Sequence, residues 1–333
     1  MLRACFTLAM VTVAAWLLAM PPALALPPPA PVDGADVRFP SASPFTLGDV
    51  GSDAPPTSAV GRLFLPPGEV AGPIPAVVLL HGAGGVMGRR ELTYARQFAA
   101  RGWAALVVDA FASRVERGTG FTGRLLNVTE AMLLADAYAG LAWLAEQPGI
   151  DAERVALVGF SYGGMAATYA LQAQVAELYQ PAGALFRAHV AFYSPCIVRF
   201  DDVRTTGAPY LMLFGTNDAI VDPDRCNAVL GDLRAGGSST ELAVYPGAAH
   251  QWDARSGGGW QAPRGLAECD FRVTADGRVR DNRTLLTLDG YLGRAAALAW
   301  CADDRGYRIE GNPRTRQLSD QRLDRFLGAA FGG

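Results

Sequence analysis

The amino-acid sequence predicts an α/β fold, in which helices flank a mostly parallel central sheet. Apolar runs of strand length alternate with segments of helical character along most of the chain, a pattern typical of this class. In addition, a glycine-flanked serine, Gly159-Phe-Ser161-Tyr-Gly163, stands between one apolar run and an alanine-rich helical segment. Ligands of such sheets bind at the carboxyl ends of the strands, so each loop that follows a strand is a candidate for function.

The main part of the chain is predicted to contain seven strands and four helices. The strands are short apolar runs of the kind that a parallel sheet buries. They span Val60–Leu65, Pro75–Leu80, Trp103–Asp109, Val155–Phe160, His189–Tyr193, Tyr210–Phe214 and Leu242–Tyr245. The helices span Glu91–Arg101, Asn127–Gln147, Ser161–Ala176 and Asp224–Ala235.

The composition indicates an ordinary globular protein. Of its 333 residues, 50% are hydrophobic and 18% are charged, and the formal net charge is −3. This balance gives no indication of nucleic acid or of a membrane surface as a partner. The sequence contains arginine but no lysine, which excludes Schiff-base chemistry and phosphate binding by a lysine.

The first 25 residues have the plan of a secretory signal peptide. Arg3 precedes an apolar core over residues 6–20, and Ala23-Leu-Ala25 offers small residues at the expected cleavage site. We therefore expect cleavage after Ala25, export to the periplasm or the medium, and no membrane association of the mature chain; a retained anchor is the alternative. The Pro- and Ala-rich segment Leu26–Ala59 is predicted to be a tether that leads into the first strands.

The glycine-flanked serine has the pattern of a nucleophile elbow. In such an elbow the serine occupies a tight, strained turn, and glycine two residues to either side lets strand and helix approach closely. The helix N-terminus behind Ser161 adds partial positive charge and free N–H groups where an oxyanion could form. The alternative is an ordinary strand-to-helix turn without a catalytic role.

The loop after Pro75–Leu80 is rich in glycine and reads His81-Gly-Ala-Gly-Gly85. Glycines at these positions let the backbone approach a ligand and direct N–H groups toward it. A dinucleotide-binding turn is the competing interpretation, with Asp109 at roughly the distance of a ribose-binding acid. However, the glycine spacing departs from G-x-G-x-x-G, which disfavours that interpretation.

Two further loops could serve the serine with an acid and a base. Asp218 follows the strand Tyr210–Phe214, whereas Asp222, just before Pro223, has the pattern of a helix cap, so Asp218 is the predicted acid. A serine nucleophile needs a base of the imidazole type. His250 is the only histidine beyond the acid and is selected almost by elimination, because the other two histidines are better explained as structural residues.

The order serine, acid, histidine, each on a loop after a successive strand, is that of α/β-hydrolases. More closely, the chain resembles the dienelactone hydrolase family from about Val60 to Asp253. Five motifs in the correct order carry this resemblance, namely Val77-Val-Leu-Leu-His81-Gly, Val107-Val-Asp-Ala-Phe111, Gly159-Phe-Ser-Tyr-Gly-Gly164, Leu213-Phe-Gly-Thr-Asn-Asp218 and Val244-Tyr-Pro-Gly-Ala-Ala-His250.

The resemblance implies hydrolysis of a small ester or lactone through an acyl-serine intermediate. His250 would take the proton of Ser161, and Asp218 would orient the imidazole. The backbone N–H groups of Tyr162 and Ala83 would bind the oxyanion. Neither a metal nor an organic cofactor is expected.

The sequence departs from the family pattern in two respects. Founding members carry cysteine as the nucleophile, whereas this chain has Ser161, which puts dienelactone itself in doubt as a substrate. The family core, residues 60–253 here, ends soon after the histidine, whereas this chain continues over residues 254–333. In this extension a hairpin turning at Asp276-Gly277 is predicted, with helices over Tyr291–Cys301 and Ser319–Phe331, and we expect the extension to pack on the core rather than to cover the site.

The mature chain would retain four cysteines in an oxidising compartment. Proximity in the expected fold suggests the bridges Cys196–Cys226 and Cys269–Cys301, although four cysteines allow three pairings. Free, buried thiols are the alternative. Four reactive thiols in the denatured, unreduced mature protein would contradict the bridges.

Several aromatic residues lie on or near the loops that carry the candidate site. Phe111, Tyr162, Trp252 and Trp260 could line an apolar pocket, or they could equally belong to the core. Three arginines could receive a substrate carboxylate or could simply be solvated surface residues. They are Arg89, Arg90 and Arg114.

Other classes of protein remain as alternatives. An exported peptidase of the prolyl oligopeptidase group would use the same serine machinery, but no propeller-sized domain precedes the core. A binding module on an inactive hydrolase scaffold would be expected to lack a member of the triad, and all three are present. Turnover of a nitrophenyl ester compared with an aminoacyl anilide separates the first alternative from an esterase.

Overall fold

The computed structural model describes residues 33–51, 54–68, 72–118, 120–180, 183–253 and 259–332. The predicted signal peptide, residues 1–25, and the start of the predicted tether lie outside these described residues. The described residues form one compact unit.

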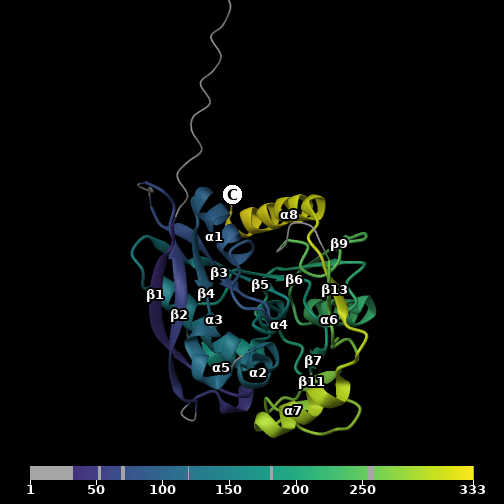
Figure 1. Ribbon diagram of the computed structural model, residues 1–333. Helices are drawn as coiled ribbons and strands as arrows, with labels where there is room; N and C mark the ends of the chain where they lie inside the picture. The colour runs from purple at the N-terminus through teal and green to yellow at the C-terminus, as the bar shows by residue number, and fades with distance from the viewer. Residues whose placement is uncertain are drawn as a thin grey trace, which may run out of the picture. The chain divides into compact units, whose positions relative to one another are not determined.

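An eight-stranded sheet forms the centre of this unit (Figure 1). Its strands lie in the order β1-β2-β4-β3-β5-β6-β8-β9, and all neighbours are parallel except the antiparallel pairs β1–β2 and β2–β4. This arrangement confirms the predicted fold class. The strands are β1 (Ala35–Ala42), β2 (Pro56–Phe64), β3 (Ile74–Leu80), β4 (Ala104–Val108), β5 (Ile150–Phe160), β6 (Ala188–Phe192), β8 (Tyr210–Gly215) and β9 (Thr240–Tyr245).

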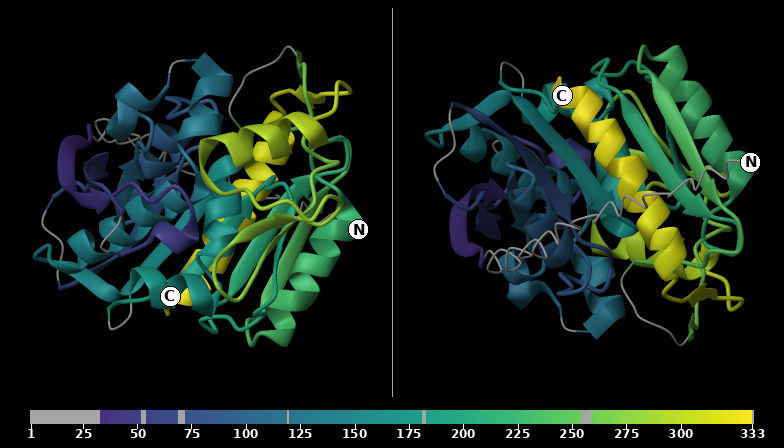
Figure 2. Two further views of the ribbon diagram at one scale, coloured as in Figure 1. Left: turned by 90° about the horizontal axis from the view of Figure 1, so that it is seen from below. Right: turned by 90° about the horizontal axis from the view of Figure 1, so that it is seen from above.

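Helices cover both faces of the sheet because successive strand residues point to opposite sides. Val78 on β3 joins a core layer beneath α3 (Glu130–Ala145), α4 (Tyr162–Tyr169) and α5 (Ala173–Tyr179). Val77, one residue earlier, joins the layer beneath α1 (Glu91–Ala100), α6 (Pro223–Ala235) and α8 (Pro313–Phe331). Viewed from above, α8 crosses the strands of the sheet (Figure 2).

Strand β1 was not predicted, because it falls in the segment expected to be a tether. Its residues pair with β2 along their whole length, from Ala35 opposite Leu63 to Ala42 opposite Pro56. Phe39 is buried and stacks on Trp143 of α3 with ring centroids 5.7 Å apart. Part of this Pro- and Ala-rich segment therefore belongs to the sheet.

The single helix expected over Ser161–Ala176 is divided into α4 and α5. The backbone leaves the helical path at Gln172, which is extended and forms an isolated bridge with Thr205. Ala173 N–H then donates to the Arg204 carbonyl at 2.8 Å. The division depends on Arg204 and Thr205, which lie far along the sequence, so the local hydrophobic periodicity does not indicate it.

The C-terminal extension contains the predicted hairpin. Strands β11 (Phe271–Val273) and β12 (Val279–Asp281) pair in antiparallel fashion, and Gly277 in the turn has a φ of +80°. Strand β11 also pairs with β7 (Val198–Phe200), and β10 (Trp260–Ala262) pairs with β13 (Tyr307–Ile309). Helix α7 (Gly290–Cys301) agrees with the prediction, whereas α8 begins six residues before the predicted Ser319, at Pro313.

One disulfide links the loop after β6 to α6, and a second joins two parts of the extension to each other. Cys196 is bonded to Cys226, and Cys269 is bonded to Cys301, across sequence separations of 30 and 32 residues. This is the pairing that the sequence suggested. Closing loops of this length stabilises the fold by about 3–4 kcal/mol each in the chain-entropy account.

The lengths and hydropathy of the helices can be compared with those of a membrane-spanning helix. Within the described ranges, no single helix is long and apolar enough to cross a bilayer. Helix α2 (Gly120–Asn127) and α3 pass that test only as a pair, with a bend of 73° between them. Most residues of α3 are buried under the sheet, as expected for a core helix.

His189 on β6 is buried and lies outside the candidate site. Its Nδ1–H donates to the Ala167 carbonyl at 3.0 Å, and burial lowers the pKa of its imidazole from 6.5 to about 4. Between these two values the unfolded chain binds a proton that the folded chain does not bind. This histidine therefore contributes stability that is fully present above pH 6.5 and is lost as the pH falls toward 4.

We expect this contribution to be about 3 kcal/mol, because each pKa unit corresponds to about 1.4 kcal/mol. Urea unfolding of the wild type and of His189→Gln at a series of pH values measures it. The free energy of unfolding of the wild type should fall more steeply with acid than that of the variant. Parallel curves for the two proteins would contradict the assignment.

Candidate active site

Ser161 occupies a strained turn between β5 and α4. Its φ of 53° and ψ of −109° lie in a region that residues other than glycine rarely adopt. A Cβ atom at Gly159 would lie 2.0 Å from the Gly163 carbonyl oxygen, and one at Gly163 would lie 2.4 Å from that of Leu80. Glycine is therefore required on both sides of the serine, as the elbow pattern predicted.

Ser161, His250 and Asp218 form one chain of hydrogen bonds. The distance from Ser161 Oγ to His250 Nε2 is 2.9 Å, and that from His250 Nδ1 to Asp218 Oδ2 is 2.7 Å. The three residues lie on the loops after β5, β9 and β8, as predicted. A carboxylate only accepts hydrogen bonds, so His250 Nδ1 carries the proton and Nε2 is free to accept from the serine hydroxyl.

The loops that carry Asp218 and His250 pack directly against each other. Asn217 N–H donates to the Ala248 carbonyl at 3.0 Å, and a Cβ atom at Gly215 would lie 2.1 Å from the same oxygen. Asp222, by contrast, caps α6, since its Oδ1 accepts from the backbone N–H of Asp224 at 2.9 Å. Asp218 therefore faces His250, whereas Asp222 caps the helix.

The extension holds the His250 loop, a feature that sequence reasoning missed. His250 N–H donates to the Arg308 carbonyl at 2.9 Å, and Glu310 N–H donates to the His250 carbonyl at 3.1 Å, next to a parallel bridge between His250 and Ile309. The Tyr307 ring meets the imidazole edge-on, with centroids 4.9 Å apart. Strand β13 therefore fixes both the backbone and the ring of this histidine.

The glycine-rich loop after β3 is held in place by His81. Its Nδ1–H donates to the Gly82 carbonyl at 2.8 Å, and its Nε2 accepts from the Ala110 N–H at 3.1 Å. Gly85, with a φ of +84°, closes the turn by donating to the Gly82 carbonyl at 2.9 Å. This histidine shapes the loop, in agreement with the sequence interpretation.

The two predicted oxyanion donors lie in neighbouring segments, Tyr162 at the start of α4 and Ala83 in the loop after β3. Tyr162 is the first residue of α4, where a backbone N–H has no acceptor within the helix. Among the described residues, the Ala83 N–H donates to no other backbone group. The close approach of Gly163 to the carbonyls of Leu80 and His81 brings the start of α4 against the strand end that leads into this loop.

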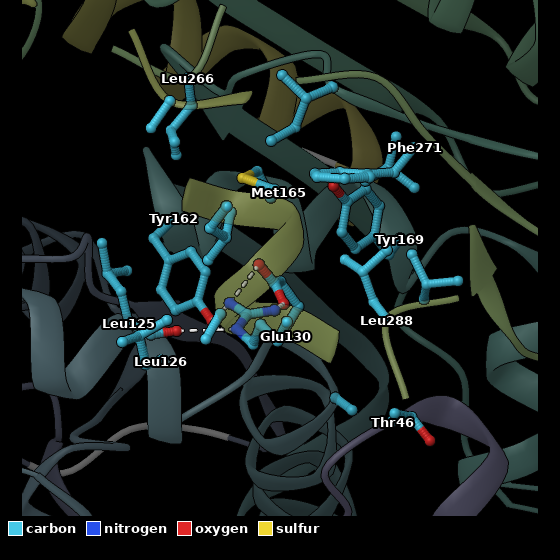
Figure 3. A pocket seen from close by; sticks show the side chains of 18 of the residues that line it. Thr46, Leu125, Leu126, Glu130, Tyr162, Met165, Tyr169, Leu266, Phe271 and Leu288 are labelled. Atoms are coloured by element: carbon cyan, nitrogen blue, oxygen red, sulfur yellow. Dashed lines mark hydrogen bonds and ion pairs between the residues drawn. The ribbon is translucent and has the colours of Figure 1, made fainter. Parts of the chain in front are cut away.

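An apolar cavity of about 280 Å³ lies beside these residues. It is lined by α2, α4, α7 and the hairpin of the extension. Figure 3 shows Tyr162 and Met165 of α4 in it, together with Leu266 and Phe271 of the extension. The cavity is therefore built jointly by the core and by the described part of the extension.

Two residues predicted to line a pocket lie elsewhere. Trp252 is buried in the core, with its Nε1–H donating to Ser319 Oγ of α8 at 3.0 Å, and it does not line the cavity. Phe111 packs on the His81 ring with centroids 4.5 Å apart and does not line the cavity either. Trp252 connects the His250 loop to α8, and Phe111 packs on His81, which holds the glycine-rich loop. Trp260 is half exposed on β10.

Two of the arginines considered for binding a carboxylate are instead buried in ion pairs. Arg90 lies 2.6 Å from Glu91, and Arg114 lies 2.6 Å from Asp136, with all four side chains fully buried. Glu91 also accepts from the Met87 N–H at 2.8 Å. These arginines are neither solvated nor available to a substrate, and the Arg90–Glu91 pair stabilises the end of the glycine-rich loop.

A family model provides the decisive comparison. The model of the dienelactone hydrolase family matches residues 60–300. The chain belongs to the dienelactone hydrolase family. The match extends beyond the predicted end of the family core at residue 253, so this family's pattern includes much of the segment that we treated as an extension.

Curated relatives within the dienelactone hydrolase family are distant. A provisionally named carboxymethylenebutenolidase of Salmonella typhimurium is 28% identical over 145 residues, which are 41% of this chain and 50% of that protein. One of Escherichia coli is 24% identical over 204 residues, 56% of this chain and 71% of that protein. The chain thus spans half of the length of the first of these relatives.

Solved structures confirm the α/β-hydrolase fold of this family member. A dienelactone hydrolase-like promiscuous phosphotriesterase from metagenomic libraries superposes with a TM-score of 0.50 at 21% identity, covering 66% of this chain and 84% of that one. An esterase of Thermogutta terrifontis, phosphoramylated by tabun, gives 0.51 at 18% identity, covering 67% and 87%. At such identities the likeness speaks for the fold alone.

Proposed function

We propose that this protein is a serine hydrolase that cleaves small carboxylic esters or lactones through an acyl-serine intermediate. The hydrogen-bonded chain from Ser161 through His250 to Asp218 is the observation that carries the proposal. Family membership supports it, since the residues lie within the matched range. In the peptidase alternative the same three side chains would act on an amide. No second observation among the described residues favours that substrate.

The first chemical step is acylation of Ser161. His250 Nε2 takes the hydroxyl proton while Oγ attacks the ester carbonyl, forming a C–O bond and a tetrahedral oxyanion. The imidazolium then gives its proton to the leaving alcohol as the ester C–O bond breaks. Asp218 holds the ring in the required tautomer and stabilises its positive charge. A water molecule activated by His250 releases the acid in the second step.

The oxyanion would be bound by the backbone N–H groups of Tyr162 and Ala83. The first lies at the N-terminus of α4, where the helix dipole also favours negative charge. The second lies in a loop that His81 and the Arg90–Glu91 pair hold rigidly. In other enzymes one such donor contributes roughly 3–4 kcal/mol to transition-state stabilisation.

We further propose that the mature protein is exported. The two disulfides support this, because such bonds persist in oxidising compartments. The amino-terminal pattern of Arg3, an apolar core and Ala23-Leu-Ala25 supports it independently. Cell fractionation combined with N-terminal sequencing tests both points, with Leu26 as the expected first residue.

Labelling with a fluorophosphonate tests the proposed function. The reagent should modify the native protein at Ser161 alone and should abolish turnover of a nitrophenyl ester in the same proportion. Labelling should be absent after denaturation, because the activated hydroxyl depends on His250. Modification at a different residue, or full ester turnover by the labelled protein, would overturn the assignment. Faster turnover of an aminoacyl anilide than of the ester would favour a peptidase.

A further inference from the structure

Neighbours of each member of the proposed triad line the apolar cavity. Its wall includes Tyr162, which follows Ser161, and Ile220, which lies two residues after Asp218. It also includes Tyr307, whose ring contacts the His250 imidazole. Three residues adjacent to the three members of the triad therefore share one cavity.

The cavity extends between the core and the extension. Met165 and Tyr169 continue the wall along α4, and Phe271 and Leu288 of the extension face them (Figure 3). The lining residues that are exposed mark where it reaches the surface. They include Phe121 of α2, which is 54% exposed, and Ala299 of α7. The opening thus involves α2 and α7, and apolar side chains border it.

The charged residues within the cavity neutralise one another. Arg294 of α7 lies 2.7 Å from Glu130 of α3, and it also donates to the Leu125 carbonyl at 2.9 Å and to the Tyr162 hydroxyl at 3.2 Å. Both carboxylate oxygens of Glu130 accept from this guanidinium, at 2.7 and 3.1 Å. Figure 3 shows Glu130 and Tyr162 among the residues that line the cavity. The only other charged lining residue among the described ones, Arg264, has a side chain that is 68% exposed.

We propose that this cavity receives an uncharged, apolar substituent of the ester, either its acyl or its alcohol group, and that the extension thereby determines substrate specificity. This inference rests on the proposed serine hydrolase function. A substrate carboxylate would meet an arginine whose charge is already balanced by Glu130 and whose guanidinium hydrogen bonds are committed. An apolar substituent, in contrast, is stabilised wherever it displaces water from this wall.

The size of the cavity sets an approximate limit for the substituent. Its volume of about 280 Å³ is nearly twice the ~150 Å³ of an apolar protein cavity that binds benzene. A substituted ring or a medium-length alkyl chain should therefore fit. Each methylene that enters such a site contributes about 0.8 kcal/mol, which corresponds to about a fourfold gain in kcat/KM.

Two series of esters test this inference with the mature wild-type protein. Nitrophenyl esters from acetyl to decanoyl vary the acyl group, and acetate esters from ethyl to octyl vary the alcohol. We expect kcat/KM to rise about fourfold per methylene in one series and then to level off. Flat profiles in both series, with acetate still hydrolysed, would overturn this inference alone. Absence of all ester turnover and of Ser161 labelling would overturn the proposed function as well.

A pair of neighbouring substitutions on α7 assigns the effect to this cavity. Ala295 lines it, whereas Ala296, next along the helix, is exposed and does not line it. Ala295→Trp should remove most of the preference for the longer chain and keep the turnover of acetate, and Ala296→Trp should preserve both. Unchanged chain-length preference in folded Ala295→Trp would refute the assignment.

A charged substrate provides a third measurement that needs no variant. A nitrophenyl hexanoate and the nitrophenyl monoester of adipic acid have acyl chains of the same length, and only the second ends in a carboxylate. We expect the neutral ester to be hydrolysed at least about thirtyfold faster in kcat/KM, since an unpaired charge would have to be buried. Equal rates, or a preference for the carboxylate, would contradict the proposed chemistry of the cavity.

Discussion

Ser161→Ala is expected to lower kcat/KM for a nitrophenyl ester by about 10⁴-fold or more. The substitution removes the Oγ that lies 2.9 Å from His250 Nε2, so no acyl-enzyme can form. The fold should be retained, because the Ser161 N–H still donates to the Phe192 carbonyl at 2.9 Å. Steady-state kinetics and a thermal unfolding curve of the same preparation measure both effects.

Ser239→Ala is the matched control for this variant. Ser239 is an exposed residue just before β9, and its side chain lies outside the proposed triad. It should leave kcat/KM unchanged within about a factor of two, as expected for a surface substitution. Ester turnover by Ser161→Ala within tenfold of the wild type would show that another group is the nucleophile.

Gly159→Ala is expected to prevent folding, or to lower the free energy of unfolding by more than about 4 kcal/mol. The added methyl group would lie 2.0 Å from the oxygen and 2.3 Å from the carbon of the Gly163 carbonyl. Both are backbone atoms of the elbow, and they cannot move without separating β5 from α4. The yield of soluble protein and urea unfolding of whatever folds provide the measurement.

Gly231→Ala provides the comparison for this effect. Gly231 lies on the exposed face of α6, and a Cβ atom there would meet nothing within 4 Å. Alanine in a helix is about 1 kcal/mol more favourable than glycine, so this variant should be as stable as the wild type or more stable. A free energy of unfolding of Gly159→Ala within about 1 kcal/mol of the wild-type value would contradict the close approach at the elbow.

The parts of the structure that the sequence predicted depend on local signals. The Gly159–Gly163 pattern specifies a strand, a strained turn and a helix within a few residues, and it placed Ser161 correctly. Asp218 and His250 follow short apolar strands, and the parallel order of those strands brings their loops to one edge. The hydrogen bonds that connect Ser161, His250 and Asp218 follow from this arrangement of loops.

The parts that the sequence did not predict depend on contacts between distant segments. Nothing in the local pattern around residues 307–310 indicates that β13 pairs with the His250 loop. The apolar cavity could not be predicted either, because its walls come from α2, α4 and α7 together. Trp252 illustrates the same limit, since its proximity to His250 suggested a pocket whereas α8 buries it.

The attachment of β13 to His250 has a consequence for how this protein can be divided. A truncation after Asp253 would keep all three members of the proposed triad, yet His250 would lose two backbone hydrogen bonds and the ring of Tyr307. The same truncation would remove one wall of the cavity, leaving Tyr162 and Met165 open to water. The proposed triad is therefore not a separable module, and fusion or permutation designs should keep all elements from β1 to α8 together.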